Sequence, residues 1–284
     1  MDKFIPIDLH CHSTYSDGAF SVKDLLDLAK ANGGKYLALT DHDTVIGINE
    51  AKDYASQIDL ELISGVEISV TWNGVLIHIV GLQINQNDKN LVKNLDNLRS
   101  SRYARGEKIA KNLEKIGIPG ALEGALKYTS SKESLSRTHF NRFLIDNGYA
   151  NAGNAFKKFL APGKPGYVAN VWASLEDAVT WINSSGGVAV IAHPCRYKLT
   201  RTKLLKLIDE FKQCGGIGIE VISSSHSKDD VINISEIANK CDLFASVGSD
   251  FHYINQSYCN PKVGINPYLP EKVKPIFSQL NISL

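Results

Sequence analysis

The stretch Asp8-Leu9-His10-Cys11-His12 ends an apolar run and then presents two imidazoles two residues apart. Side chains two apart in an extended segment point the same way, so His10 and His12 can bind one metal ion while Cys11 faces away from it. One His-x-His pair is weak evidence by itself. Further residues of metal-binding types lie at or near the ends of other apolar runs: Asp41, His42, Asp43, Glu67, His78, His193, Glu220, Asp250 and His252. This repetition predicts a metal centre to which several strand ends contribute.

The composition is that of an ordinary globular chain. Its 284 residues, 43% hydrophobic and 21% charged, suffice for one large domain or for one domain with an insertion. A formal net charge of +1 gives no global signature of nucleic-acid binding. Any preference for polyanions must therefore be local.

The cysteines and the apolar runs bear on the cellular compartment. An odd number of cysteines without a C-x-x-C pair argues against a disulfide framework and predicts reduced thiols. The five are Cys11, Cys195, Cys214, Cys241 and Cys259. The first residues lack the apolar region of a signal peptide, and no run of about 18 apolar residues occurs. We therefore expect a cytoplasmic protein with no membrane partner.

Residues 1–82 alternate strand and helix patterns. Apolar runs predict five strands: 5–9, 36–40, 60–66, 68–71 and 75–82. Asn73-Gly74 is typical of a tight turn, so the last two strands should pair antiparallel. An amphipathic helix with Ser21 as its N-cap is expected over 21–32, and a second helix, capped by Thr44, runs toward residue 56.

Residues 83–173 follow a helical pattern without buried strands. Between residues 99 and 115, six basic residues stand against two acidic ones. A solvated helix face explains many such runs. The basic bias nevertheless continues as far as Lys164, so a role in anion binding stays open. We interpret this segment as a helical insert that covers the active site, with Pro162-Gly163-Lys164-Pro165-Gly166 as its hinge.

The alternation of strands and helices returns after residue 173. Helices are expected at 174–184, 200–214 and 230–239, and strands at 188–192, 217–222 and 243–247. Continuous apolar runs between helices suit parallel strands that are covered on both faces. The sequence therefore predicts an α/β, barrel-like domain in two segments, 1–82 and 174–284, interrupted by the insert 83–173.

In a parallel barrel, side chains at the carboxyl ends of different strands converge on one face. Nine residues are candidate metal ligands: His10, His12, Asp17, His42, Glu67, His78, His193, Asp250 and His252. This number exceeds the needs of one ion and predicts two or three. A carboxylate such as Glu67 can bridge two ions about 3.5 to 4 Å apart, a geometry suited to phosphoryl groups.

Taken in order, these motifs resemble the polymerase and histidinol phosphatase (PHP) family. The resemblance rests on His10-Cys11-His12, Thr40-Asp41-His42-Asp43, Glu67, His78, His193-Pro194 and Gly248-Ser249-Asp250-Phe251-His252. It implies a distorted (β/α)7 barrel with up to three metals. One ion would be held by His10, His12, Glu67 and Asp250, a second by Glu67, His78 and His193, and a third by Asp17, His42 and His252. Glu67, His193 and Asp250 would be the catalytic residues.

The ligand types bear on the identity of the metal. Asp17 stands where some members of the family have histidine, which adds a hard oxygen ligand. Oxygen ligands favour Mn²⁺ over an all-zinc site, with Zn²⁺, Fe²⁺ and Mg²⁺ as the alternatives.

The insert narrows the resemblance to one branch of the family. Ser136-Arg137-Thr138-His139-Phe140, Gly163-Lys164-Pro165-Gly166-Tyr167-Val168 and Ala192-His193-Pro194-Cys195-Arg196-Tyr197 resemble 3′,5′-nucleotide bisphosphate phosphatases and a related 5′-to-3′ exoribonuclease. The resemblance implies hydrolysis of the 3′-phosphate of nucleotide bisphosphates, and trimming of short RNA. A phosphatase of histidinol phosphate or another small phosphomonoester is the alternative enzyme. A non-catalytic, metal-binding regulatory domain is the alternative of another class.

Five residues are candidates for substrate binding: Arg137, His139, Lys164, Arg196 and His226. Guanidinium groups bind phosphate oxygens through paired hydrogen bonds, which suits the second phosphate of a nucleotide bisphosphate. His226 is also a candidate proton donor, or a loop residue on the surface. Asp41 is expected to orient a histidine, and Tyr197 to pack in the core. The sequence makes no prediction of the oligomeric state.

Overall fold

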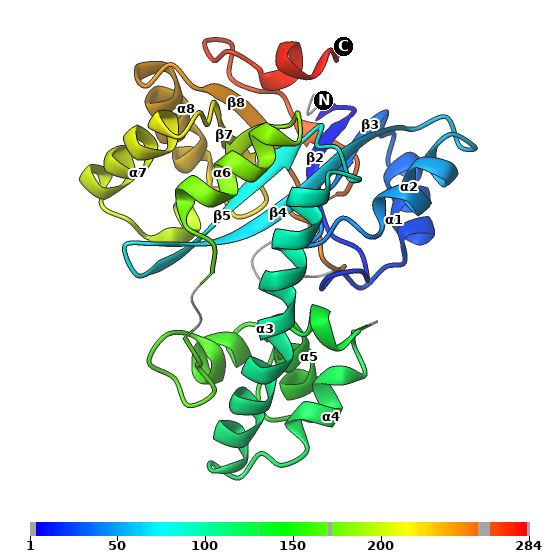
Figure 1. Ribbon diagram of the computed structural model, residues 1–284, viewed down its shortest axis with the longest axis vertical. Coiled ribbons are helices and arrows are strands. Elements are labelled where there is room, and N and C mark those ends of the chain that lie inside the picture. Colours follow the sequence, from blue (N-terminus) through cyan, green and yellow to red (C-terminus); the bar gives the residue numbers. More distant parts are fainter. Residues whose placement is uncertain (1–3, 130, 170–171, 255–261, 283–284) are drawn as a thin grey trace.

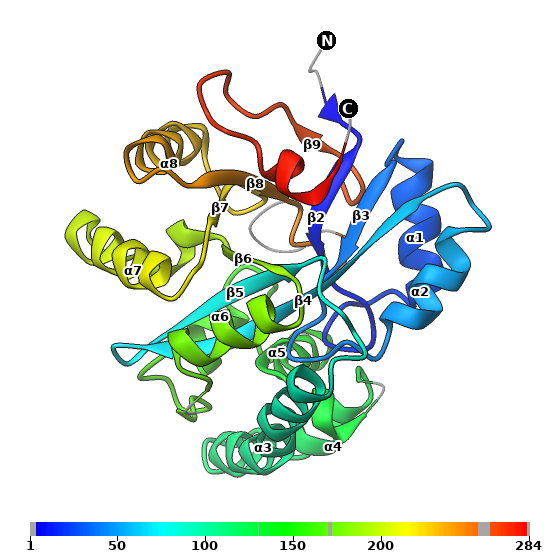
Figure 2. The ribbon, with the colours of Figure 1, turned by 45° about the horizontal axis from the view of Figure 1, so that its top comes forward.

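The computed structural model describes residues 4–129, 131–169, 172–254 and 262–282. Seven strands form one sheet in the order β2-β3-β4-β5-β6-β7-β8. They are β2 (Ile7–Cys11), β3 (Tyr36–Leu39), β4 (Glu61–Trp72), β5 (Val75–Leu82), β6 (Val188–Ile191), β7 (Gly218–Ser223) and β8 (Phe244–Gly248). The two edge strands, β2 and β8, lie close to each other (Figure 2). The Asp250 N–H, just after β8, donates to the carbonyl of His10 on β2 at 2.7 Å. The predicted α/β barrel is confirmed as a nearly closed one.

Strand β5 is the exception to the parallel pairing of this sheet. It runs antiparallel to both β4 and β6, whereas the other neighbouring strands are parallel. The predicted hairpin at Asn73-Gly74 is confirmed, with Trp72 opposite Val75. The prediction of two separate strands before it is wrong, because β4 continues without a break from Glu61 to Trp72. This long strand carries Glu67 into the centre of the barrel end.

Proline and capping residues set the ends of two other elements. Pro6 has no N–H for a ladder, and it separates β1 (Phe4–Ile5) from β2. Strand β1 pairs instead with β9 (Asn266–Pro267), and β2 extends past the predicted end at Leu9 as far as Cys11. The expected cap at Thr44 is wrong: α2 (Ile48–Ala55) begins after Gly47, while the Thr44 hydroxyl accepts the Ile46 N–H at 3.3 Å.

Five helices cover the outside of the barrel (Figure 1). They are α1 (Val22–Ala31), α2, α6 (Leu175–Ser184), α7 (Arg201–Gln213) and α8 (Lys228–Lys240). The N-cap of α1 is confirmed, since the Ser21 hydroxyl accepts the Asp24 N–H at 3.2 Å. Short helices η3 (Pro194–Tyr197) and η4 (Ile276–Leu280) follow β6 and β9.

The segment after β5 leaves the barrel through the long helix α3 (Lys89–Glu114), and the figure shows a separate lobe around its far end (Figure 1). The lobe contains α4 (Ala121–Leu126), η1 (Lys132–Ser134), α5 (Arg137–Asp146) and the π-helix η2 (Phe156–Leu160). Helix α3 belongs to two cores, because Leu91 and Leu95 pack with the barrel whereas Ile109 and Leu113 pack with the lobe. The division at residue 83 stays a prediction.

The cysteines that the structure describes are free thiols, the state that the sequence predicts. Cys11 is fully buried, and its Sγ lies 3.2 Å from the Ala38 carbonyl oxygen, away from the histidines beside it. Cys195, Cys214 and Cys241 are also free, and Cys259 lies outside the described residues. Within the described ranges, no helix has both the length and the apolarity to span a bilayer.

Candidate metal centre

Glu67 lies at the centre of a histidine cluster and is fully buried on β4. Its Oε1 lies 2.8 Å from His78 Nδ1 and 2.9 Å from His193 Nε2. Its Oε2 lies 2.9 Å from His42 Nδ1 and 3.3 Å from the Nε2 atoms of His10 and His12. One carboxylate therefore faces five imidazoles, which is an arrangement suited to bridging metal ions.

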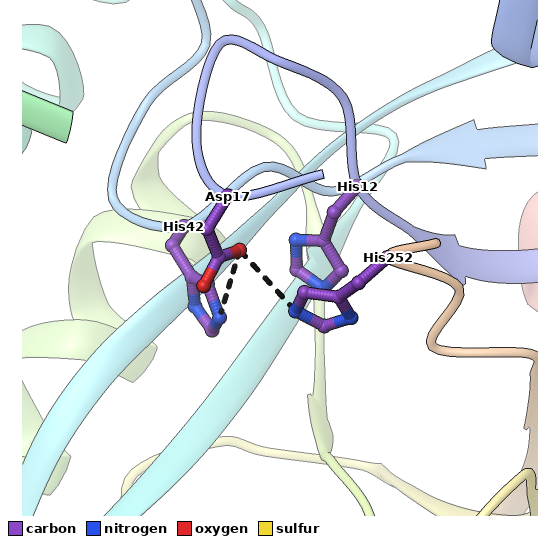
Figure 3. A group of neighbouring side chains, drawn as sticks. All are labelled: His12, Asp17, His42 and His252. Carbon is purple, nitrogen blue, oxygen red and sulfur yellow. Dashed lines mark ion pairs between the residues drawn. The ribbon is translucent and has the colours of Figure 1, made fainter. Parts of the chain in front are cut away.

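Three groups of side chains bring their ligand atoms within 4.8 Å of one another. They are His10, His12, Glu67 and Asp250; His42, Glu67 and His78; and His12, Asp17, His42 and His252. Figure 3 shows the last group, in which Asp17 Oδ1 lies 3.2 Å from His252 Nε2 and 3.8 Å from His42 Nε2. His193 joins the cluster through Glu67, so all nine predicted ligands lie together. Which residue binds which ion stays a prediction.

Several ligand atoms in this cluster are buried without a hydrogen-bond partner among the described residues. They include His10 Nε2, Asp17 Oδ1 and Glu67 Oε2. Buried polar atoms in native proteins are nearly always satisfied. Divalent cations between imidazoles and carboxylates would satisfy these atoms, so the residues present fit a metal centre.

The carboxylates are held ionised by the surrounding side chains. Burial opposes ionisation of Glu67, but the neighbouring histidines outweigh it and hold its pKa well below the usual range. Burial is likewise outweighed at Asp250, where the Arg196 guanidinium and His10 hold the pKa well below its ordinary value. The centre therefore presents negative charge to a cation.

Four of the ligand histidines have shifted pKa values, and these four divide into two classes. Burial alone would lower the pKa of each, and it does so for His193, to about 4, and for His42. At His10 the carboxylates of Glu220, Glu67 and Asp250 overcome burial and raise the pKa well above 6.5. At His12, Asp250 and Glu67 raise the pKa to about 10. His10 and His12 are therefore protonated near neutral pH in the metal-free protein.

Metal uptake should consequently release protons. A metal ligand must be a neutral imidazole, so loading at pH 7.5 is expected to release about two protons, from His10 and His12, and to tighten as pH rises. A pH-stat titration of the metal-free protein with Mn²⁺ measures this directly. Metal binding with no proton release would contradict the protonation of these two histidines.

Two buried carboxylates orient the ligands without joining the three groups. Glu220 on β7 accepts from His10 Nδ1 at 2.6 Å and from the His193 backbone N–H at 2.6 Å, which turns His10 Nε2 toward Glu67. Asp8 accepts the Ser249 N–H at 2.8 Å and thereby holds the turn before Asp250. The sequence pattern indicated Glu220 as a residue of a metal-binding type, but it did not predict that Glu220 orients His10. For Asp8, the signal was a lone charge in an apolar run.

Asp41 has a different role from the one expected. It accepts hydrogen bonds from the Ser13 N–H and hydroxyl at 2.8 and 2.6 Å, and from the Ser16 hydroxyl at 2.6 Å. It therefore holds the loop that leads to Asp17, and the structure gives it no bond to a histidine among the described residues. The expectation that Asp41 orients a histidine is wrong.

Tyr197 does more than pack in the core. Its hydroxyl accepts the His78 N–H at 2.9 Å and donates to the Ala192 carbonyl at 2.7 Å. These bonds fix the backbone at two ligand-bearing positions, because His193 follows Ala192.

Three of the nine non-glycine residues with positive φ in the described part of the chain lie within or next to this cluster. Asp43, His193 and Asp250 adopt φ values of 52°, 26° and 48°. Non-glycine residues rarely occupy this region, and such conformations gather at functional sites. In two of the three cases the strained residue is a candidate ligand.

The predicted substrate-binding residues differ in whether they contact this centre. Arg196 forms an ion pair with Asp250, and His226 Nδ1 lies 3.0 Å from the Val221 carbonyl, just after β7. His139 is fully buried at the start of α5, where its Nδ1 accepts the Ser136 N–H at 3.1 Å. Arg137 donates to the Leu160 carbonyl at 3.3 Å, and Lys164 is exposed in a turn. The structure thus joins Arg196 to the cluster directly, whereas Arg137 and Lys164 remain within the insert.

The PHP domain model matches residues 8–224. The chain belongs to the PHP family. PHP proteins are metal-dependent phosphoesterases, in keeping with the ligand types found here. The resemblance drawn from separated motifs is confirmed.

Curated relatives of this PHP protein cover nearly its whole length. It is 44% identical over 275 residues to a 3′,5′-nucleoside bisphosphate phosphatase of Chromobacterium violaceum, covering 96% of each chain. It is 42% identical to a 5′-3′ exoribonuclease of Haemophilus influenzae, over 87% of this chain and 89% of the relative. Among solved structures, an amidohydrolase from Chromobacterium violaceum with bound sulfate and no metal superposes with a TM-score of 0.94 at 43% identity, covering 98% of this chain and 96% of the other.

Proposed function

We propose that this PHP protein hydrolyses phosphate esters of nucleotides, in the first place the 3′-phosphate of 3′,5′-nucleotide bisphosphates. The observation that carries phosphoester hydrolysis is the buried Glu67 carboxylate facing five imidazoles. The choice of substrate is supported by the bisphosphate phosphatase that is 44% identical across 96% of the chain. Trimming of short RNA from its 5′ end is a second activity, supported by the 42% identical exoribonuclease.

Bound divalent ions would neutralise charge on the oxygens of the transferring phosphoryl group. We assign Glu67, His193 and Asp250 to hold these ions at the reacting phosphate, with the other six histidine and aspartate ligands completing the centre. Mn²⁺ is the proposed metal because the carboxylates of Asp17, Glu67 and Asp250 add hard oxygen ligands to the imidazoles.

Arg196 is the proposed contact for a phosphate oxygen at the centre. It already lies against Asp250, with its side chain 26% exposed, so it can reach a bound substrate from the loop after His193. Its planar guanidinium suits paired hydrogen bonds to a phosphate.

A second phosphate would bind where the arginines of the insert gather. Burial, with Arg137 and Arg102 nearby, lowers the pKa of Arg105 to about 9. Arg102 and Arg105 both stack on Trp172, and Arg137 lies over the rings of Phe156 and Tyr167. A dianion near Arg105 and Arg137 would relieve the repulsion among these guanidinium groups, of which Arg102 is already paired with Asp43. Lys164, from the neighbouring turn, would complete this binding site for the second phosphate.

The two remaining histidines are proposed to contact substrate in their neutral form. Burial lowers the pKa of His139 to about 4 and also lowers that of His226. His139 Nδ1 accepts a backbone N–H, so Nε2 carries the proton and donates. His226 Nδ1 donates to a carbonyl, so Nε2 accepts. This tautomer argues against His226 as the proton donor to the leaving group.

Product analysis tests the proposed reaction. Incubated with adenosine 3′,5′-bisphosphate and Mn²⁺, the full chain should release inorganic phosphate and leave adenosine 5′-monophosphate. Release of the 5′-phosphate would contradict the proposed regiochemistry. No hydrolysis of this nucleotide or of a generic chromogenic phosphate ester would instead favour a non-catalytic regulatory domain. We place the reaction in the cytoplasm, with a small nucleotide or short RNA as the partner.

The ion held by Asp17 can be counted. Asp17→Ala should lower the metal content by about one ion of the two or three proposed, since it removes one ligand of the group with His42 and His252. Elemental analysis of the purified protein measures the difference. An unchanged metal content would remove Asp17 from the ligand set.

A further inference from the structure

We propose that the insert is a positioning device for the metal group formed by His12, Asp17, His42 and His252, and that an ion bound there in turn locks the insert onto the barrel. The inference rests on the proposed metal centre and adds a linkage to it. All four ligands follow strands rather than lie on them, and the insert contacts the loops that carry two of them, Asp17 and His42. The residues that hold those two loops come in part from the insert.

The first contact fixes the orientation of the Asp17 carboxylate. The Ser136 hydroxyl at the start of α5 donates to Asp17 Oδ2 at 3.1 Å. Oδ1 is thereby left to face His252 and His42, as Figure 3 shows, and it has no hydrogen-bond partner among the described residues. One oxygen is held by the insert, and the other is presented to the metal group.

Two more bonds hold the backbone of the same loop. Arg142, six residues further along α5, donates from its Nη2 to the Asp17 carbonyl at 2.9 Å. The Ser134 hydroxyl, at the end of η1, donates to the Tyr15 carbonyl at 2.7 Å. On the barrel side, the Asp41 carboxylate binds Ser13 and Ser16. The loop therefore lies between the barrel and the insert and is bonded to both.

A separate contact from α3 reaches the His42 loop. Arg102 is 5% exposed and forms an ion pair with Asp43, the residue after His42. Asp43 is fully buried, has a φ of 52°, and also accepts the Ser69 N–H at 2.7 Å. A buried carboxylate requires a compensating charge, and the insert helix supplies it. Displacing α3 would leave this charge unpaired beside a ligand.

Linkage follows from these contacts. If a docked insert favours the ligand geometry of Asp17 and His42, then an ion bound to that geometry must favour the docked insert by the same free energy. Residues that orient metal ligands typically change metal affinity by roughly 10- to 100-fold when replaced. We expect changes of that size for the ion at this group alone.

Arg142 offers a cleaner test than Ser136. The Ser136 hydroxyl also accepts the Thr138 N–H as the N-cap of α5, so its loss would weaken that helix in any case. Arg142 is half-buried, and its guanidinium donates a hydrogen bond to the Asp17 carbonyl. Arg142→Met removes the donor, and Arg142→Lys can restore a cationic one. Lys157→Met is the matched control, because Lys157 is an exposed cation on η2.

The experiment measures metal content and protection from protease on the full chain. Wild type and Lys157→Met should retain equal Mn²⁺ after dialysis, Arg142→Met should lose about one ion, and Arg142→Lys should regain much of it. Mn²⁺ should slow cleavage within the insert of the wild type and do so less in Arg142→Met. Ser136→Asp, which keeps a capping acceptor but sets a carboxylate against Asp17, should behave as Arg142→Met does.

The outcomes separate this inference from the proposed metal centre. If Asp17→Ala loses an ion while Arg142→Met and Ser136→Asp keep full content and full protection, the positioning role is wrong and the metal centre stands. If Asp17→Ala loses no ion, the metal group itself is wrong, and the linkage falls with it. Loss of metal in Arg142→Met without rescue by lysine would also overturn the role of a donor at this position.

Discussion

Glu67→Gln is expected to abolish phosphoester hydrolysis, lowering kcat by roughly 10³-fold or more, while the barrel stays folded. The amide has the shape of the carboxylate but cannot balance the charge of two cations. Among the described residues, Glu67 is the only carboxylate that approaches ring nitrogens of all five histidines His10, His12, His42, His78 and His193. Initial rates on a generic phosphate ester, with circular dichroism for the fold, measure both parts of the prediction. His193→Asn should show a loss of the same kind.

Glu61→Gln is the matched control for this substitution. Glu61 is the exposed first residue of the same strand, so its replacement should leave the rate unchanged. Near wild-type activity in Glu67→Gln, with the metal content unchanged, would contradict a bridging role for this carboxylate.

The second large effect concerns the choice between mono- and bisphosphorylated nucleotides. Arg137→Ala and Arg196→Ala are each expected to lower kcat/KM on a 3′,5′-bisphosphate by roughly 10- to 100-fold, the range for hydrogen bonds to charged groups. Hydrolysis of a small generic phosphomonoester should be largely spared in Arg137→Ala but lowered in Arg196→Ala, because Arg196 lies against Asp250 at the metal centre. Arg137 is proposed to act at the binding site for the second phosphate within the insert, and Arg196 at the loop beside Asp250.

Arg201→Ala is the control for these two arginine variants. Arg201 is an exposed arginine at the start of α7, and Arg201→Ala should change neither rate. If Arg137→Ala lost both substrates alike, Arg137 would act at the metal centre and not at a separate site for the second phosphate. That result would make a monoester such as histidinol phosphate the favoured substrate.

The sequence predicted the barrel because most elements carry their own local signals. Ser21 before an amphipathic run and Asn73-Gly74 between two apolar runs fix a cap and a hairpin through short-range chemistry. The failures occurred where context overrode those signals. Thr44 is a good capping residue by type, yet it closes a turn instead, and α2 begins after Gly47.

The gathering of the candidate ligands other than Asp17 could be predicted from their places at or near the ends of apolar runs, but the network around them could not. Glu220 and Asp8 act through partners more than 200 residues away in the chain. The positive φ angles of His193 and Asp250 leave no mark on residue type. Likewise, nothing local to Ser136 or Arg142 indicates that each bonds to Asp17, because that contact exists only once the insert is docked.

The most direct measurement is kcat/KM on a panel of adenosine 3′,5′-bisphosphate, adenosine 5′-monophosphate, histidinol phosphate and a short 5′-phosphorylated RNA, each with Mn²⁺. The bisphosphate should lose its 3′-phosphate with a kcat/KM roughly 10- to 100-fold above both monophosphates, because a monophosphate has no second phosphate to bind among the insert arginines. Equal values on mono- and bisphosphorylated substrates, or histidinol phosphate as the best substrate, would contradict a nucleotide bisphosphate phosphatase.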